Sequence, residues 1–353
     1  DPRLISVIPA AVAKAAVDSG VARKKIDDFE IYKDQLKQRL DPTVTIMQGI
    51  NSFIKKNQKR IVFADGEDEN TLKAAIAFKN SKLGIPILVG KESKIKEQIR
   101  NIGYNENFDI EIINSKDEEK RKKYLKHLFE KLQREQGLLE RDCDRLLRND
   151  RVIWATSMVA CGDADGAVTG NTRRFGASLE KIKQVVDVRK GEIMFGLNMV
   201  VHKGRTIFIG DTSVHEYPTS EELAEIAIST ARVVRLFGFE PKVAFVSHST
   251  FGQPLTSRTK HIRNAVEILK EKQVDFEFDG DMQPDVALNS EYEELYPFTK
   301  IVGKANILIM PGQHSAAISY KLMKTIGDTK VIGPLLIGLG LPIEIATLRT
   351  STS

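Results

Sequence analysis

The chain has 353 residues, of which 41% are hydrophobic and 29% charged, as expected for a soluble globular protein with two or three domains. The net charge of +5 is spread thinly, with no dense basic block interleaved with aromatic residues, so we expect no nucleic-acid partner. No apolar run approaches the ~18 residues of a membrane span, so we expect no membrane partner.

Cysteine usage and the first residues bear on location. The two cysteines, Cys143 and Cys161, lack metal-ligand spacing and favour a reducing cytoplasm. The opening residues DPRLISVIPAA lack the basic region and long apolar core of a signal peptide. We therefore expect a cytoplasmic chain that is part of a longer one.

Residues 1–43 are expected to form a unit of their own. Helical spacing is carried by Ile8, Val12, Ala15, Ala16 and Ser19. Gly20 follows as a C-cap, and a second helix is predicted from Asp27 or Asp28 through Leu40, ended by Asp41-Pro42. Two short helices cannot bury a core alone, so they need a partner.

An alternation of strands and helices begins at Lys59. The expected order is a strand at 60–66, a helix at 69–80, a strand at 85–90 and a third strand around 109–113. Such alternation predicts βαβ units and a parallel sheet. The charged residues 115–150 contain an apolar stripe of leucines, which indicates an amphipathic helix with a solvated outer face.

Residues 151–181 begin with a buried helix or strand and continue through a turn at Gly162–Gly166 into a short strand. Asp163 and Asp165 in that turn are compatible with a metal ligand pair, but their spacing does not match an EF-hand loop and favours a tight turn. Asn171, Thr172, Arg173 and Arg174 follow the strand. Open α/β sheets bind ligands at such strand ends.

A second α/β unit is predicted after about residue 190. Paired strands at 194–201 and 206–211 are joined by the turn HKGR, and Thr219 or Ser220 caps a helix that runs to about Phe237. Further elements are expected as strands at 242–254, 276–285 and 305–312 and helices at 263–272 and 315–326.

The closing stretch, residues 333–353, joins an apolar run containing three glycines to a polar tail. The tail holds Thr347, Arg349, Thr350, Ser351 and Thr352. Hydroxyls, a guanidinium and backbone N–H groups suit a phosphate-bearing ligand. The alternative is a last core strand followed by a frayed end.

Three strand ends therefore form the candidate site, at 247–254, 279–285 and 347–351. Their candidate ligand-binding residues include Ser247, Ser249, Thr250, Gly252 and Asp279. Hydroxyls and backbone N–H groups there suit phosphate or pyrophosphate, and Asp279 and Asp281 suit a base or an orienting group. His248 is either a general base or a solvated loop residue. No Walker A motif and no GxGxxG after a strand is present, so we find no nicotinamide site.

Several segments resemble the phosphate acetyltransferase family, in order and at family spacing, from about residue 44 to the end. They include FADGEDENTLKAA, GDADGAVTG, EPKVAFVSHSTFG, DGDMQPDVAL, GKANILIMP and IGPLLIGLGLP. The earlier DPRLI, IPAAVAKAAVDSGVA and IDDFEIY are similar to the end of the catalytic part of bacterial NADP-dependent malic enzymes. Those enzymes carry a phosphotransacetylase-like C-terminal domain.

The resemblance implies an α/β fold of two subdomains around a cleft. The first, a three-layer α/β/α sandwich, would comprise residues 44–190 and 336–353, and the inserted second would comprise 191–335, with 1–43 ending the malic enzyme part. The implied ligand is acetyl-CoA or CoA, while NADP and a divalent metal (Mg or Mn) would belong to the malic enzyme core outside this chain. A homo-oligomer with dimer contacts through this domain is also implied.

The resemblance also marks positions where this chain departs from the family. The family's Ser-Arg pair falls on Thr347 and Leu348, with Arg349 one step on. A conserved Arg-Pro pair falls on Glu180 and Lys181, and a lysine falls on Phe251. The family's catalytic aspartate would fall beyond Ser353. Losing guanidinium forks weakens phosphate binding, so we predict little or no acetyl transfer.

Three functions follow as hypotheses. The first is a regulatory domain that binds acetyl-CoA, informs the malic enzyme domain of its level and helps assemble the oligomer. The second is an active acyltransferase with a rearranged phosphate site, in which Arg173, Arg174 and Arg349 compensate. The third is a purely structural oligomerisation module.

Overall fold

The structure is a computed structural model that describes residues 4–22, 26, 29, 32, 54–105, 109–114, 117–327 and 329–348. The chain divides into two compact units. Unit 1 comprises Asp1–Ser52 and Asn198–Ile332, and unit 2 comprises Phe53–Leu197 and Gly333–Ser353. The subdomain boundaries predicted from the sequence stay a prediction. Among the described residues, no helix is both long and apolar enough to cross a membrane.

The predicted first helix is confirmed as α1 (Leu4–Asp18). Gly20 follows with a φ of 77°, the left-handed conformation in which glycine commonly ends a helix. The second predicted helix, from Asp27 or Asp28 to Leu40, falls almost entirely outside the described residues.

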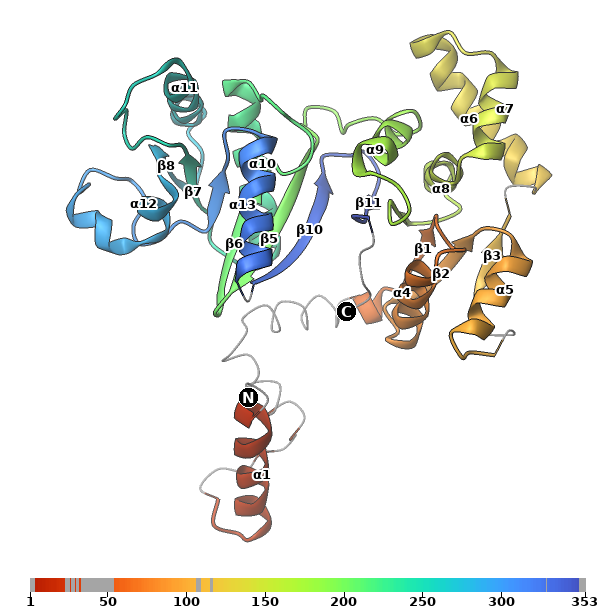
Figure 1. Ribbon diagram of the computed structural model, residues 1–353, viewed down its shortest axis with the longest axis horizontal. Coiled ribbons are helices and arrows are strands. Elements are labelled where there is room, and N and C mark those ends of the chain that lie inside the picture. The colour runs from red at the N-terminus through yellow and green to blue at the C-terminus, as the bar shows by residue number, and fades with distance from the viewer. Residues whose placement is uncertain are drawn as a thin grey trace. The chain divides into compact units, whose positions relative to one another are not determined.

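Unit 2 contains a five-stranded parallel sheet in the order β11-β4-β1-β2-β3 (Figure 1). Its strands are β1 (Lys59–Phe63), β2 (Gly84–Val89), β3 (Glu111–Ile113), β4 (Gly166–Thr169) and β11 (Ile343–Ile345). Parallel strands are covered on both faces, which is why they form unbroken apolar runs in the sequence. The predicted parallel sheet is confirmed.

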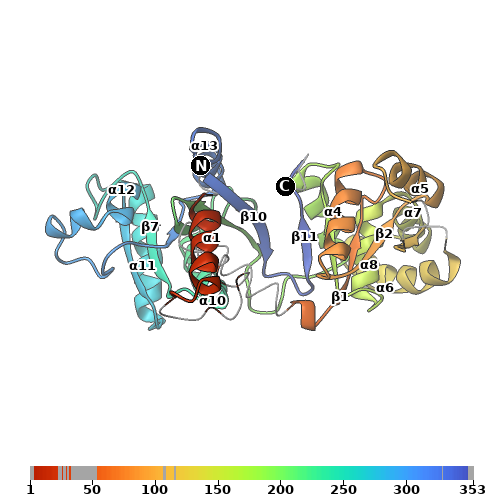
Figure 2. The same cartoon turned by 90° about the horizontal axis from the view of Figure 1, so that it is seen from below.

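Helices cover both faces of this sheet (Figure 2). They are α4 (Glu69–Asn80), α5 (Glu92–Asn101), α6 (Glu118–Gln136), α7 (Glu140–Asn149), α8 (Arg151–Ala160) and α9 (Phe175–Lys183). α4 and α5 share one core with Phe63 and Leu88, while α8 contacts β1 and β4 and is surrounded by α6, α7 and α9. α8 is buried from Val152 to Val159, which resolves the helix-or-strand alternative in favour of a helix.

The charged stretch 115–150 forms two helices rather than one. α6 ends at Gly137, whose φ of 67° lets its backbone N–H bond back to the Leu132 carbonyl. α7 restarts three residues later and packs against α6. The sequence contained this signal, because Gly137 stands alone within an otherwise strong helix-forming run.

Unit 1 is built on a six-stranded sheet in the order β10-β5-β6-β9-β7-β8. Its strands are β5 (Phe195–His202), β6 (Arg205–Gly210), β7 (Lys242–Val246), β8 (Glu277–Met282), β9 (Ile307–Ile309) and β10 (Thr329–Ile337). β5 and β6 are neighbours, as the predicted hairpin requires. β6, β9, β7 and β8 run parallel, so their carboxyl ends lie at one edge.

Unit 1 places helices on both faces of its sheet (Figure 2). They are α10 (Ser220–Leu236), α11 (Ser257–Glu271), α12 (Pro284–Leu288), the 3-10 helix η1 (Ser290–Glu294) and α13 (Gln313–Ile326). α10 and α11 pack together on one face, and α12 and α13 share a core on the other. The predicted cap of α10 is confirmed, because Thr219 and Glu222 bond reciprocally to each other's backbone N–H groups.

The close packing of β11 against β4 can be tested by substitution of Gly170, which follows β4. Its φ is 101°, and a Cβ there would lie 2.5 Å from both the Ala346 carbonyl oxygen and Ile345 Cγ2. Gly103 is a matched control, with a φ of 85° and open space around it. We expect Gly170→Ala to lower the free energy of unfolding by about 3 kcal/mol or more, since strain and overpacking add, and Gly103→Ala by about 1 kcal/mol. Urea denaturation measures both free energies of unfolding. Equal decreases for Gly170→Ala and Gly103→Ala would contradict the close packing at Gly170.

Glu344 on β11 predicts a pH effect on stability. Burial raises the pKa of Glu344 to about 7 from its ordinary 4.5, against the effect of the 2.9 Å hydrogen bond from Leu336 N. Its folded pKa is the higher one, so the stability that this carboxyl contributes at low pH is lost as pH rises through about 7.

Glu344→Gln keeps an acceptor for Leu336 but does not titrate. Relative to the wild type, the variant should gain stability by up to about 1.4 kcal/mol per pH unit across the window between the two pKa values. Chemical denaturation of both proteins at pH 5 and pH 8 measures this difference. A difference that is the same at both pH values would show that the carboxyl is not perturbed.

Candidate functional site

The carboxyl ends of β7 and β8 bring two predicted serines to a buried carboxylate. Ser247 Oγ lies 3.0 Å from Ser249 Oγ, and the Ser249 hydroxyl donates to Asp281 Oδ2. Asp281 is fully buried, and its Oδ1 has no hydrogen-bond partner among the described residues. Arg263 Nε lies 4.0 Å from that oxygen. Burial of a carboxylate is costly unless it is hydrogen-bonded or lies near a cation. We therefore infer that Asp281 fixes the positions of Ser249 and Arg263 at this edge of the sheet.

The turn after Ser249 is wrapped around Asp281. Phe251 N donates to the Asp281 carbonyl oxygen at 2.7 Å, and Gly252 N donates to Asp281 Oδ2 at 3.3 Å. Phe251 and Gly252 both have left-handed backbone conformations, with φ of 48° and 85°. A Cβ on Gly252 would lie 2.6 Å from an Arg263 guanidinium nitrogen, so the guanidinium rests directly on this glycine.

Arg263 was not among the predicted site residues. It lies on α11, two turns beyond the hydroxyl-rich loop, and 48% of its side chain is exposed. It therefore places a positive charge at the edge where Ser247, Ser249 and Gly252 gather. The signal in the sequence was an arginine on the helix that follows a glycine-containing strand end.

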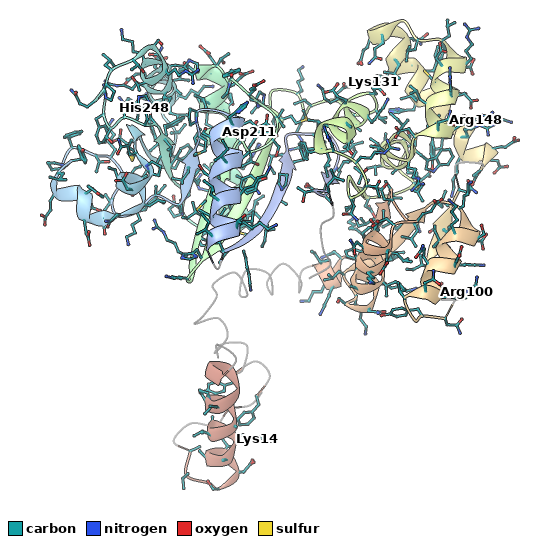
Figure 3. All side chains as sticks on the ribbon, in the orientation of Figure 1. Lys14, Arg100, Lys131, Arg148, Asp211 and His248 are labelled. Carbon is teal, nitrogen blue, oxygen red and sulfur yellow. The ribbon has the colours of Figure 1, made fainter. Side chains whose placement is uncertain are left out.

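Thr250 joins the same turn, whereas Asp279 does not. Thr250 Oγ1 accepts a 3.3 Å hydrogen bond from Gln283 N. Asp279 Oδ2 instead accepts from Lys300 N at 2.8 Å and from Thr299 Oγ1 at 3.3 Å, so it fixes the loop that follows η1. His248 is exposed (Figure 3), and its carbonyl oxygen accepts from Gln283 Nε2 at 2.8 Å.

A histidine–aspartate pair that the sequence did not reveal lies after β6, also at the carboxyl edge of unit 1. Asp211 is buried and accepts from the backbone N–H groups of Ser213, Val214 and His215. Its Oδ2 lies 2.7 Å from His215 Nδ1, and this hydrogen bond raises the pKa of His215. The sequence signal was an aspartate at a strand end with a histidine four residues later.

In unit 2, the predicted cluster after β4 is tied to acids. Three of its four side chains donate, Asn171 to Asp68 Oδ1 (2.6 Å), Thr172 to Asp65 Oδ1 (2.7 Å) and Arg173 to Asp150 Oδ2 (2.7 Å). Arg174 is exposed at the N-cap of α9. Of the four, Arg174 is therefore the residue best placed to contact an anionic ligand.

The predicted C-terminal residues are only partly within the described chain. Thr347 and Leu348 follow β11, and Leu348 is 50% exposed. Arg349, Thr350 and Ser351 lie outside the described residues. The three predicted strand ends also fall in two different units, so their convergence stays a prediction.

At three positions where the family resemblance leads us to expect a cation, namely Glu180, Phe251 and Leu348, this chain has none. Glu180 is exposed on α9 and accepts from Lys183 Nζ at 3.1 Å. Phe251 packs its ring against Tyr296 and Phe298, with ring centroids 5.4 and 4.8 Å away. Phe251 therefore contributes to an aromatic cluster.

The paired aspartates of the turn at 162–166 hold that turn in place. Asp163 accepts from Lys123 Nζ and Tyr124 Oη, each at 2.7 Å. Although burial acts to raise it, these hydrogen bonds hold the pKa of Asp163 below its usual value. Asp165 accepts from Arg60 N at 2.8 Å. Among the described residues, no group of three or more His, Cys, Asp or Glu side chains is arranged to hold a metal ion.

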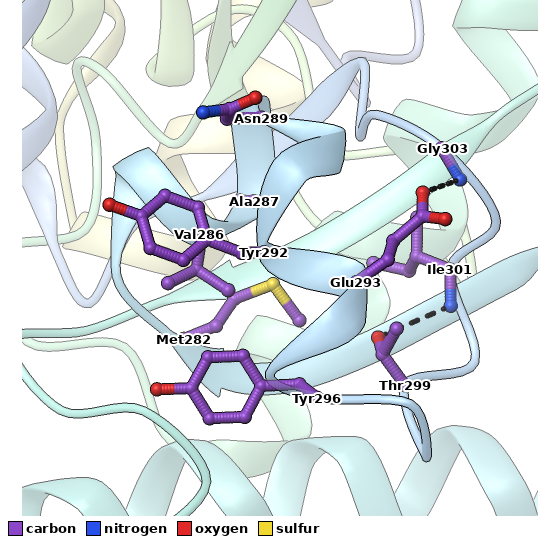
Figure 4. A pocket seen from close by; sticks show the side chains of 10 residues that line it. All are labelled: Met282, Val286, Ala287, Asn289, Tyr292, Glu293, Tyr296, Thr299, Ile301 and Gly303. Carbon is purple, nitrogen blue, oxygen red and sulfur yellow. Dashed lines mark hydrogen bonds between the residues drawn. The ribbon is translucent and has the colours of Figure 1, made fainter.

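A pocket behind the serine cluster is too small for a cofactor (Figure 4). It lies between Met282, Tyr292 and Tyr296, and its volume is about 20 Å³. The hydrogen bond from Gly303 N to Glu293 Oε1, 2.7 Å long, closes one side. A cavity of roughly 10–15 Å³ by this measure holds one water molecule, so this pocket has room for about one.

Comparison with known proteins places the chain in a family. The sequence profile described as phosphate acetyl/butaryl transferase matches residues 45–352. A phosphate acetyltransferase of Clostridium acetobutylicum is 33% identical over 85% of this chain and 92% of its own length. A phosphotransacetylase from Streptococcus pyogenes has a TM-score of 0.80 at 27% identity, over 87% of this chain and 94% of that one.

A longer protein matches more closely in sequence. An NADP-dependent malic enzyme of Rhizobium meliloti is 44% identical over 100% of this chain, which spans 46% of that protein. The chain thus spans about half the length of the malic enzymes it matches. The predicted resemblance and the phosphotransacetylase-like α/β fold are confirmed. The chain belongs to the phosphate acetyl/butaryl transferase family.

Proposed function

We propose that this chain is a regulatory domain that binds acetyl-CoA and transfers its acetyl group to phosphate slowly or not at all. The observation that carries the proposal is the loss of positive charge at three positions where the family resemblance expects a cation. Glu180 is an exposed acid, Leu348 is an exposed aliphatic side chain, and Phe251 belongs to an aromatic cluster. Phosphate recognition depends on cationic donors, so binding of inorganic phosphate should be weak.

Coenzyme binding makes different demands from phosphate transfer. A ligand at a strand edge is held by backbone N–H groups, hydroxyls and peripheral cations. The Thr250 hydroxyl and the half-exposed Arg263 supply such groups in unit 1, and Arg174 supplies a cation in unit 2. These groups support acetyl-CoA binding in the absence of turnover.

The wider role proposed for the domain comes from its relatives. We infer that it forms part of an NADP-dependent malic enzyme, which oxidatively decarboxylates malate to pyruvate, and that acetyl-CoA binding here changes the activity of that catalytic domain. NADP and the divalent metal, Mg or Mn, would be held by the catalytic domain of the same protein. Cytoplasmic location fits the two free cysteines.

One surface favours a second role in assembly. The exposed face of α13 presents Ile318, Leu322 and Ile326 at spacings of four residues, with exposed fractions of 59%, 53% and 82%. An apolar stripe of this kind on a surface helix is typical of a helix that packs against another chain. We propose that this face contributes to a homodimer formed through unit 1.

Replacing Leu322 and Ile326 with Glu should shift the distribution measured by sedimentation velocity toward the monomer, because charged side chains would be buried at the interface. An unchanged distribution would exclude the α13 face from the dimer interface.

Isothermal titration calorimetry with acetyl-CoA tests the regulatory proposal. Saturable binding in the micromolar to millimolar range is expected. The absence of both binding heat and a thermal shift at millimolar acetyl-CoA would exclude the regulatory proposal and favour a purely structural module. Formation of acetyl phosphate at ordinary enzyme rates would favour the alternative of an active phosphate acetyltransferase.

Arg174 provides a more specific prediction. Arg174→Gln should weaken acetyl-CoA binding severalfold, because it removes an exposed guanidinium from the carboxyl edge of unit 2. Lys126→Gln is the matched control, since Lys126 is an exposed lysine of unit 2 on α6 and belongs to no predicted site. Calorimetry on both variants measures the effect. Identical dissociation constants for Arg174→Gln, Lys126→Gln and the wild type would remove Arg174 from the site.

A further inference from the structure

A second cavity lies in unit 2, where the acetyl-CoA proposal assigns no residue. Its volume is about 320 Å³, and it opens beyond the carboxyl ends of β2 and β3, next to Gly90 and Asn114. Open parallel sheets bind ligands at this edge, and the volume is within the range of small-ligand sites, roughly 300–1,000 Å³. The charged residues that line it are Glu67, Lys91, Arg121, Arg148, Asp150 and Arg151.

Two of the arginines share a single carboxylate. Asp144 accepts from Arg121 Nε at 3.1 Å and from Arg148 Nε at 2.6 Å. Arg121 is held tightly, with 13% of its side chain exposed, whereas Arg148 at the end of α7 is 53% exposed (Figure 3). Arg121 also lies 3.7 Å from the exposed Glu118, so these two guanidinium groups are paired with two carboxylates.

A second group of charges surrounds Glu67. Glu67 Oε2 lies 3.2 Å from an Arg151 guanidinium nitrogen and 3.7 Å from Lys94 Nζ, and Glu67 Oε1 accepts from Lys91 N at 2.9 Å. Burial acts to raise the pKa of Glu67, but these groups hold it below its usual value, so Glu67 stays ionised. Here a single negative charge faces two cations, which leaves one positive charge in surplus.

The remaining lining groups do not cancel this surplus. Asp150 is engaged by the first N–H groups of α8 and by Arg173. Lys91 forms no ion pair through its ammonium group within the part of the chain that the structure describes. Lys91 is also the N-cap of α5 and provides no side-chain cap, so the positive end of that helix faces the same rim. Four cations and two carboxylates line the cavity. With their ion-pair partners Lys94, Arg173, Glu118 and Asp144 included, six cations face four carboxylates, so two positive charges remain in surplus.

We propose that this cavity binds a ligand through two or more linked phosphate groups, as in pyrophosphate or the diphosphate of a nucleotide. Guanidinium groups match the geometry of phosphate oxygens, and four cations around a concave site favour a multiply charged anion over a single carboxylate. We propose ligand binding here and no reaction, whether or not acetyl-CoA binds elsewhere in the chain.

Inorganic pyrophosphate is the probe, titrated by calorimetry into the whole chain at low salt. Lys91 and Arg148 are the side chains to change, because both are exposed at the rim and neither is part of the hydrophobic core. We expect pyrophosphate to bind to the wild type, and the double variant Lys91→Gln/Arg148→Gln to bind it at least 10-fold more weakly. The wild-type affinity should also fall as salt is raised.

The matched control is Lys122→Gln/Lys126→Gln, which removes two exposed charges from α6 outside the cavity. It should bind pyrophosphate as the wild type does. The proposal is overturned if the wild type shows no binding at millimolar pyrophosphate, if the Lys91/Arg148 double variant binds equally well, or if the control loses as much affinity. Unchanged thermal melting of both double variants would show that any loss is local.

A competition arm identifies the source of the phosphate groups. Coenzyme A itself carries a diphosphate, as free phosphorylated metabolites also do. If acetyl-CoA displaces pyrophosphate from the wild type, the cavity holds the diphosphate of the coenzyme. If the two ligands bind together, the cavity takes a separate phosphorylated molecule. Because the pyrophosphate arm contains no acetyl-CoA, failure of this inference and failure of the regulatory proposal give different results.

Discussion

Placement of positive charge is the constraint on which this molecule's chemistry depends. A phosphate group that takes part in a transfer reaction must be held by cations at fixed positions. A coenzyme that is only bound needs fewer such contacts. Where the family resemblance leads us to expect cations, this chain has Glu180, Leu348 and Phe251. Cations are nevertheless present elsewhere in the fold, and many of them form ion pairs with carboxylates.

Both units use the same architecture to create an edge for ligands. Parallel strands end together, and the loops that follow them are held by buried acids. In unit 1, Asp281 bonds to the turn after β7 and to Ser249, and Asp211 bonds to the loop after β6. In unit 2, Asp65, Asp68 and Asp150 accept from the segment that follows β4. These carboxylates fix backbone geometry, so ligand contact is left to backbone N–H groups and to the cations at the rim.

Much of the fold followed from the sequence because its signals were local. Apolar runs at 60–66 and 85–90 predicted buried parallel strands, and Thr219 with Glu222 predicted a capped helix. The break at Gly137 was missed because leucines on both sides of it continue the stripe. In the site, the sequence analysis predicted the serines but not Arg263, which lies near Asp281 and Gly252 from a separate helix. The pairing of Asp211 with His215 is local, four residues apart, but the sequence analysis did not consider it. The direction of Asp279 depends on tertiary contacts with Thr299 and Lys300 that no spacing rule encodes. The charge surplus around the second cavity arises from α5, α6, α7 and α8 together, so no single segment shows it.

The central claim is that the domain binds acetyl-CoA without transferring the acetyl group to phosphate. The most direct test is the rate at which the purified chain forms acetyl phosphate from saturating acetyl-CoA and inorganic phosphate, measured beside a phosphate acetyltransferase of the same family. We expect a rate at or near background from a protein whose acetyl-CoA sites are occupied. A rate comparable to that of the active enzyme would contradict it.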